Sequence, residues 1–183
     1  MVVAETERLI IRYLTIDDSV FIFKLYNSEP FIEFVGDKNI KSVEEAKKYL
    51  IDGPIKMYTQ KGVGLYLVEL KNEQIPLGIC GLIKRDNLDD IDIGYGFLPD
   101  YCGFGYAYES AHAVLDYAKQ TLNLKRVVAI TTFDNISCIR LLSKLGLEYI
   151  GILDERFKSN EVNNDDSVEN SCRRSMRLYA INF

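Results

Sequence analysis

The sequence predicts an α+β fold in which a single domain, residues 1–183, carries a mixed, mostly antiparallel twisted sheet with helices on both faces. Three observations support this. The 183 residues are 48% hydrophobic and 27% charged, enough for one substantial core. Several short alternating apolar runs are joined by tight turns, which indicates antiparallel hairpins. Farther along, a helical pattern lies between two strand patterns, which predicts a right-handed β-α-β unit with parallel strands.

The first half of the chain predicts a strand, two helices and a hairpin. Residues 8–13 form the first expected strand. Thr15 can then cap a helix that ends at Pro30 at the latest. A second helix begins at the capping box of residues 42–45 and stops at residues 53–54, Gly-Pro. The next expected elements are strand 64–70, turn 71–74, strand 75–83, turn 86–90 and strand 91–97.

A turn rich in small residues joins the strand at 91–97 to the next helix. Gly103, Gly105 and Ala107 stand at every second position where that helix begins. Small residues let a ligand approach the backbone, and the first amides of a helix lack acceptors and carry partial positive charge. The segment therefore favours phosphate or diphosphate binding, with a plain tight turn as the alternative. Tyr108 stands where a dinucleotide fingerprint needs glycine, and no Gly-Lys-Ser/Thr follows, which argues against both common nucleotide loops.

The last third of the chain predicts a second helix between strands. A strand rich in β-branched residues is broken at Asp134-Asn135, and Gly146 is placed to cap the helix that follows. The closing segments are polar or alternating. The expected order is strand 126–132, helix, strand 148–157, polar segment 158–170 and strand 173–181.

Composition argues against several classes of protein. The four cysteines are scattered without a Cys-x-x-Cys and His112 is the only histidine, so we expect no metal site, no disulfide framework and a cytoplasmic location. The net charge is −5 and no basic patch stands out, so we expect no nucleic-acid partner. No apolar run approaches the roughly 20 residues of a membrane span, and the N-terminus does not look like a signal peptide.

Four segments in register resemble one known family. They are Thr6–Arg12, Asp92–Tyr95, Tyr101–Ser110 and Asn135–Leu147. Together they are similar to the GNAT superfamily of acetyl-CoA-dependent N-acetyltransferases, and within it to the RimJ/RimL type, which acetylates the N-termini of ribosomal proteins. The chain departs from that pattern at Cys102, where this branch has Trp, and at Cys138, where the last helix usually carries serine.

The resemblance implies direct transfer of an acetyl group from acetyl-CoA to a primary amine, without an acyl-enzyme. The strand at 91–97, helped by its glycines, would part from its neighbour and pair with the pantetheine arm at Phe97 and Leu98. The Phe97 amide would stabilise the oxyanion. Asn135 would contact the pantetheine, cap the last helix, or do both. The resemblance places the pyrophosphate at the turn residues Cys102, Gly103, Phe104, Gly105, Tyr106 and Ala107.

Proton transfer falls to side chains that the sequence leaves open. An amine is mostly protonated at neutral pH, so some group must accept its proton. Asp92 matches the family's acidic residue and could act through a water, or it is an ordinary solvent-face carboxylate. Ser137, Cys138 and Tyr149 are candidates for the acid that protonates the leaving thiolate. Cys138 is alternatively a small apolar residue at the start of the helix's buried stripe.

The acceptor is the partner that the sequence determines least. A protein N-terminus and a small-molecule amine both stay open, and so do a monomer and a homodimer. We expect the acceptor pocket between residues 21–49 and the polar segment 158–170, where Asp165, Asp166 and Glu169 attract a cation or merely face solvent. A non-catalytic CoA-binding or regulatory module and an acyltransferase for longer acyl-CoA are the alternative functions.

Overall fold

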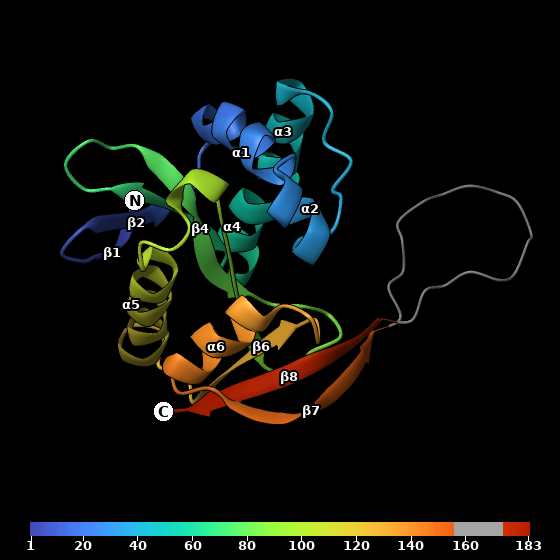
Figure 1. Cartoon of the computed structure of the whole chain (residues 1–183). Helices are drawn as coiled ribbons and strands as arrows, with labels where there is room; N and C mark the ends of the chain where they lie inside the picture. Colours follow the sequence, from blue (N-terminus) through green and yellow to red (C-terminus); the bar gives the residue numbers. More distant parts are fainter. Residues whose placement is uncertain (156–173) are drawn as a thin grey trace, which may run out of the picture.

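The computed structural model describes residues 1–155 and 174–183, whose strands form one sheet (Figure 1). The strand order is β1-β2-β3-β4-β5-β6-β8-β7. All neighbouring pairs are antiparallel except β5 and β6, which confirms the predicted mixed sheet and the α+β class. The expected polar segment 158–170 lies outside the described residues. The strands are β1 Val2–Glu5, β2 Leu9–Tyr13, β3 Leu65–Leu70, β4 Pro76–Ile83, β5 Ile91–Phe97, β6 Arg126–Thr131, β7 Glu148–Glu155 and β8 Arg174–Asn182.

Helices cover both faces of the sheet, as predicted. On one face, side chains such as Ile22 of α1 pack with Leu67 of β3 in one buried cluster. On the other face, Val114 of α5 and Leu142 of α6 belong to a second and larger cluster. The sheet therefore lies between two layers of helix. The helices are α1 Ser19–Tyr26, α2 Glu29–Val35, α3 Val43–Leu50, α4 Lys56–Lys61, α5 Tyr106–Gln120 and α6 Ile136–Lys144.

The two parallel strands at the centre of the sheet part soon after they meet. β5 continues in register with β4 as far as Phe97. Its pairing with β6 consists of Ile91 with Val127 and Asp92 with Val128. Beyond Asp92 one edge of β5 is therefore unpaired by the sheet, which confirms the expected parting of these strands.

Two glycines in β5 make room for side chains that pack over the strand. A Cβ atom at Gly96 would lie 3.0 Å from the Phe31 ring of α2, and one at Gly94 would lie 3.1 Å from Ile83. Both distances are shorter than ordinary contacts between carbon atoms. Glycine at these positions lets α2 and the end of β4 approach β5 closely.

The sequence did not predict β1. Val2–Glu5 pairs antiparallel with β2, and Tyr13 N–H donates to Met1 C=O at 2.9 Å. None of its four residues is fully buried, so no apolar alternation marks the segment. Backbone pairing along β2 holds this strand, and pairing with a distant segment leaves little trace in a local pattern.

One of the two predicted helix stops is confirmed and the other is wrong. α1 ends at Tyr26, before Pro30 as expected, but Pro30 itself lies in the first turn of α2. Proline suits that position because the N–H it lacks would have no helical acceptor. The predicted stop at residues 53–54 is wrong, since a π-helical turn, Ile51–Ile55, carries the chain past Pro54 into α4. α4 ends instead at Gly62, whose φ of 70° is left-handed.

The predicted N-cap at Ser42 is confirmed, whereas Thr15 precedes a 3₁₀ turn, Ile16–Asp18, and does not cap α1 itself. Ser42 Oγ accepts the Glu45 amide at 3.2 Å, as an N-cap should. Glu45 accepts from the Lys41 amide at 2.6 Å, one residue before the N-cap of a standard capping box. Ahead of α1, the Asp18 carboxylate accepts the Thr15 amide at 2.8 Å.

Candidate active site

Among residues 1–155 and 174–183, no strand pairs with the edge of β5 beyond Asp92. Leu98 N–H donates to Leu77 C=O of β4 at 2.9 Å. The N–H and C=O groups of successive residues in a strand point to opposite edges, so those of Gly96 also point to β4. The N–H and C=O groups of Tyr95 and Phe97 point to the other edge, from which β6 has parted. The Phe97 amide therefore points where the resemblance expects an oxyanion donor, while its side chain is buried in the core.

The glycine turn after β5 presents a run of amides. Gly103 and Gly105 both have left-handed φ, 85° and 84°, which side-chain-bearing residues rarely adopt. Glu109 N–H donates to Gly105 C=O, the first bond of α5. In the part of the chain that the structure describes, the amides of residues 103–108 have no protein acceptor. A Cβ at Gly103 would meet nothing within 4 Å, so the space beside these amides is open.

These features fit a diphosphate. Six amides at the start of a 15-residue helix are available to donate hydrogen bonds. They also lie at the positive end of the helix dipole, which favours an anion. The Cys102 thiol hydrogen bonds to Leu98 C=O at 3.6 Å, and burial raises the pKa of that thiol. It therefore stays neutral beside the turn and adds no charge that would repel an anion.

The start of α6 is held by Asn135. Its side-chain oxygen accepts the Cys138 amide and the Ser137 hydroxyl, both at 3.0 Å. The N-cap interpretation of Asn135 is thus confirmed. Contact with pantetheine stays a prediction, and the two roles are compatible. Ser137 is exposed and its hydroxyl is engaged with Asn135, which places it at the helix surface.

Cys138 lies in a cluster of polar groups from three other positions. The Tyr95 and Thr131 side chains lie beside its thiol and favour its ionised form, whereas the charge of the Asp92 carboxylate disfavours that form. Burial raises the pKa of Cys138, and the two hydroxyls offset this only in part. Burial likewise raises the pKa of Tyr95, with Cys138 adding to the effect. At neutral pH both groups are therefore protonated.

Asp92 does not lie on a solvent face, so that interpretation is wrong. It is 1% exposed, and its carboxylate forms an ion pair with Arg85, Nε to Oδ2 2.6 Å. The parting of β5 and β6 begins at this residue, which pairs with Ile83 of β4 and is met by Arg85 from the loop after β4. Alternation along the strand shows on which face Asp92 lies, but not that other elements cover that face.

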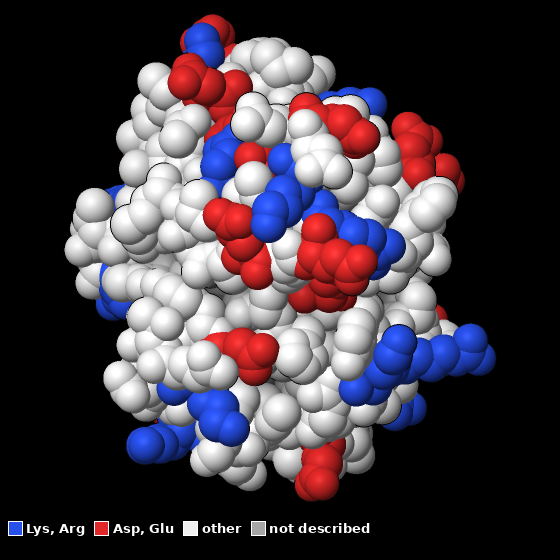
Figure 2. All heavy atoms as spheres, turned by 90° about the vertical axis from the view of Figure 1, so that its left-hand side faces the viewer, with Lys and Arg blue, Asp and Glu red and all other residues white. Residues whose placement is uncertain are grey.

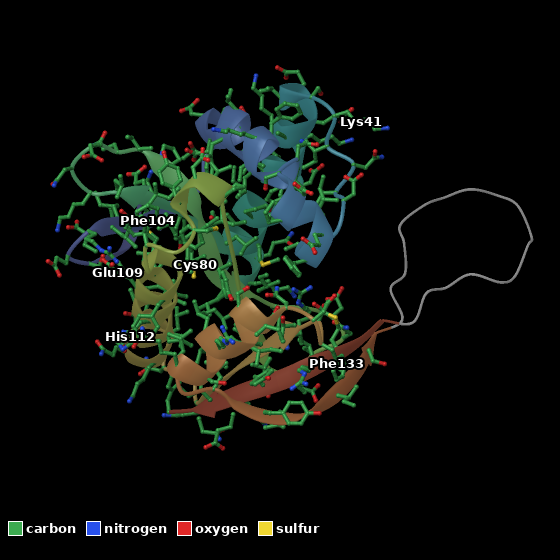
Figure 3. The ribbon with its side chains drawn as sticks, viewed as in Figure 1. Lys41, Cys80, Phe104, Glu109, His112 and Phe133 are labelled. Carbon is green, nitrogen blue, oxygen red and sulfur yellow. The ribbon has the colours of Figure 1, made fainter. Side chains whose placement is uncertain are left out.

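The sequence missed Tyr95, Thr131 and Arg85 as site residues. Tyr95 lies in a segment that resembles the family, and Thr131 ends a strand rich in β-branched residues. Neither residue type indicates by itself that the side chain belongs to a site. Tyr149, a candidate acid, packs instead on the edge of the sheet, where its ring contacts Tyr179 and the Arg177 guanidinium. Figure 3 shows Phe133 near the same strands, on the side away from the glycine turn.

Residues of the expected acceptor side are mostly core. Tyr26 stacks on Phe31 with ring centroids 4.2 Å apart, and both rings are buried. The Tyr26 and Tyr49 hydroxyls hydrogen bond to each other at 3.0 Å. Asp165, Asp166 and Glu169, the possible attractants of a cation, lie outside the described residues.

His112 is a surface residue of α5. It pairs with Asp116 one turn on, Nδ1 to Oδ2 3.2 Å, and both side chains are more than half exposed. Figure 3 shows it farther along the helix than Phe104 and Glu109. Among the described residues, no helix is long and apolar enough to cross a membrane, and no group of three or more acidic, cysteine or histidine residues is placed to hold a metal.

Comparison with known families agrees with this geometry. The family model described as an acetyltransferase (GNAT) domain matches residues 8–148, well over half of the chain. The chain therefore belongs to the GNAT acetyltransferases. Three of the four segments that carried the resemblance fall within the matched range, and the first, Thr6–Arg12, overlaps its start.

Individual relatives cover nearly the whole chain. The uncharacterized N-acetyltransferase YoaA of Bacillus subtilis is 28% identical over 167 residues, 91% of this chain and 94% of that protein. A GNAT-family acetyltransferase of Bacillus anthracis has the same fold, with TM-score 0.74 at 22% identity over 97% and 96% of the two chains. RimL, the ribosomal L7/L12 α-N-protein acetyltransferase solved with coenzyme A, gives TM-score 0.79 at 16% identity over 100% and 98%. At these identities the structural likeness establishes the fold, and it includes RimL-type enzymes.

Proposed function

We propose that this protein transfers the acetyl group of acetyl-CoA directly to a primary amine. One observation carries the proposal: the free edge of β5 is followed, after a short 3₁₀ turn at Pro99–Tyr101, by amides of residues 103–108 that have no acceptor among the described residues. Such an arrangement suits a ligand with a peptide-like arm and a diphosphate at one end. Coenzyme A has both. Among the solved relatives, RimL is described as a complex with coenzyme A, and the microcin C7 self-immunity acetyltransferase MccE as a complex with acetyl-CoA and AMP.

The backbone does the binding in this proposal. Acetyl-CoA supplies the activated acetyl group as a thioester. The backbone of Tyr95 and Phe97 offers hydrogen bonds to the pantetheine arm, and the turn amides donate hydrogen bonds to the diphosphate. The Phe97 N–H, directed away from β4, donates to negative charge that develops on the thioester oxygen.

Side chains handle the protons. Cys138 stays protonated because burial raises its pKa, and the Tyr95 side chain lies beside it. We therefore favour Cys138 as the donor of a proton to the departing thiolate over Ser137, whose hydroxyl donates to Asn135. Asp92 accepts the amine's proton through water. Its ion pair with Arg85 makes this carboxylate a weaker base.

The acceptor is an amine of one of two kinds. Structural relatives include enzymes described as a ribosomal-protein-serine acetyltransferase of Vibrio cholerae and a spermidine N-acetyltransferase chimera. A protein N-terminus and a small-molecule amine therefore stay the two classes to test. We expect the enzyme to act in the cytoplasm as a monomer or homodimer.

The test is release of free thiol from acetyl-CoA against a panel of ribosomal N-terminal peptides, polyamines, amino acids and aminoglycosides. CoA and acetyl-CoA should also raise the melting temperature, because a ligand that binds only the folded state stabilises it by mass action. No thermal shift at saturating coenzyme would contradict the proposal at its base.

The ion pair between Arg85 and Asp92 favours one alternative function. If that carboxylate is fully engaged, the chain is a non-catalytic CoA-binding or regulatory module. Thermal stabilisation by CoA without thiol release on any amine would support it. Faster turnover with longer acyl-CoA than with acetyl-CoA would indicate the other alternative, an acyltransferase of different chain-length preference.

A further inference from the structure

Two of the segments that resemble the family, Thr6–Arg12 and Tyr101–Ser110, are about 100 residues apart in the sequence and meet at the glycine turn. Glu109 Oε1 accepts from the Thr6 hydroxyl at 2.5 Å and from the Arg8 amide at 3.1 Å. Glu109 Oε2 accepts from Arg8 Nε at 2.7 Å. Arg8 Nη1 in turn donates to Phe104 C=O at 3.0 Å. We call Thr6, Arg8 and Glu109 the turn bracket. Figure 3 shows Phe104 and Glu109 at the end of α5 that meets the β1–β2 hairpin.

The bond to Phe104 determines which way the next amide points. In a planar trans peptide the C=O and the following N–H point in opposite directions. Arg8 therefore holds the Gly105 N–H on the side of the turn away from its own guanidinium. The remaining space is limited, because a Cβ at Gly105 would lie 3.5 Å from Arg8 Nη2. The guanidinium also stacks over the Tyr106 ring at 4.6 Å, which ties it to the first residue of α5.

The charge of Arg8 is balanced within the bracket. Burial alone would raise the pKa of Glu109, but hydrogen bonds from Thr6 and Arg8 outweigh it and lower that pKa. Both partners are thus charged at neutral pH and their pair is neutral overall. On this side of the molecule acidic and basic side chains interleave rather than forming a patch of one sign (Figure 2). The bracket therefore acts on the shape of the turn rather than by attracting an anion.

We propose that Arg8 and Glu109, steadied by Thr6, are positioning residues that hold the Phe104–Gly105 peptide so that the turn amides face the diphosphate of the acyl donor. The inference rests on the proposed function, because it concerns how the same donor is bound. It assigns to the β1–β2 hairpin, a part of the sheet remote from the parting of β5 and β6, a role in donor recognition.

The experiment compares two donors with each variant. Acetyl-CoA carries the diphosphate, and acetylpantetheine carries the same thioester and arm without it. For Arg8→Ala and Glu109→Gln we expect KM for acetyl-CoA to rise about five- to tenfold, the range for losing one charge-assisted hydrogen bond at a partly exposed site. We expect kcat with acetyl-CoA and KM for acetylpantetheine to stay at the wild-type values. The dissociation constant of CoA, measured by calorimetry, should rise by the same factor.

A conservative variant separates position from charge. Arg8→Lys keeps a positive charge beside Glu109, but one ammonium group does not reproduce the planar fork that reaches both Glu109 and Phe104. We expect its KM for acetyl-CoA to rise as well. Wild-type behaviour of Arg8→Lys, with loss in Arg8→Ala, would show that charge alone matters and would overturn the positional role.

The matched control lies on the same hairpin. Glu5→Gln removes the exposed ion pair between Glu5 and Lys71, 3.0 Å, which does not touch the turn, and we expect no change with either donor. Equal losses with both donors, or none with either, would overturn the inference while leaving the transferase function intact. A wild-type protein that neither binds CoA nor releases thiol would instead overturn the proposed function, and the inference with it.

Discussion

The two halves of the candidate active site are built from different materials. The donor half, residues 95–108, uses backbone amides from one continuous segment. The proton-handling half uses side chains of four elements: Tyr95 on β5 and Thr131 on β6 lie beside Cys138 on α6, and Asp92 of β5 pairs with Arg85 in the loop after β4. A backbone site needs the right chain conformation, whereas a side-chain site needs particular residue types at places that only folding brings together.

This difference predicts how much each departure from the family pattern matters. Cys102 stands in place of the expected Trp in the donor half, yet the turn keeps its two left-handed glycines and its open amides. Cys138 stands in place of the usual serine in the other half, and there the change replaces the group that would carry a proton. The four experiments that follow test this contrast, from the largest expected effect to the smallest.

The largest effect is expected in the proton-handling half. Cys138→Ala removes the proposed proton donor, so kcat should fall by about a hundredfold, the lower range for general acid–base catalysis. The dissociation constant of CoA should not change. Steady-state kinetics with calorimetry measures both. Ser137→Ala is the neighbouring control and should leave kcat nearly unaltered, so equal effects of the two variants would break the assignment.

A backbone change should damage the donor half without altering its chemistry. Gly105→Val forces a β-branched residue into a left-handed conformation, at a cost of about 2 kcal/mol or about thirtyfold in CoA affinity if the turn relaxes to avoid it. Gly62 is the control because it has φ of 70° with open space around it at the end of α4. Gly62→Val should lower the melting temperature similarly while CoA still binds with wild-type affinity.

The ion pair at the parting of the strands can be tested for structure and chemistry separately. Asp92→Asn should lower the free energy of unfolding by about 2 kcal/mol, less than for a fully buried pair because Arg85 is partly exposed. Denaturant unfolding measures this. Adding Arg85→Ala should restore part of that stability, since it removes the unpaired cation. If Asp92 also serves as the base, the double variant regains stability but not activity; recovery of both would leave Asp92 a purely structural role.

The smallest effect concerns the pH dependence of the turn bracket. The native pKa of Glu109 lies below its unfolded value of about 4.3, so the bracket stabilises the fold above that value and loses this contribution as pH falls through the native pKa. The free energies of unfolding of the wild type and of Glu109→Gln should differ by less than about 1 kcal/mol at pH 7, because Arg8 is exposed. That difference should shrink toward pH 3. A difference that grows on acidification would contradict the lowered pKa.

Prediction from the sequence succeeded where one segment determines its own structure. The turn at Gly103 and Gly105, the helix that begins after it and the cap at Asn135 all follow from local hydrogen bonding and backbone preference. It failed at β1 and at the π-helical turn through Pro54. In both cases a distant or unusual backbone partner overrides the local pattern.

The sequence alone determined that a strand, a glycine turn and a helix follow one another, and hence that a row of amides faces outward at one place. The tertiary structure alone decided that Asp92 is covered and paired with Arg85, that Tyr95 and Thr131 meet Cys138, and that Arg8 reaches Phe104. The physical reason is that chirality and hydrogen bonding act between near neighbours in the chain, whereas burial and ion pairing depend on which other elements come to lie above each residue.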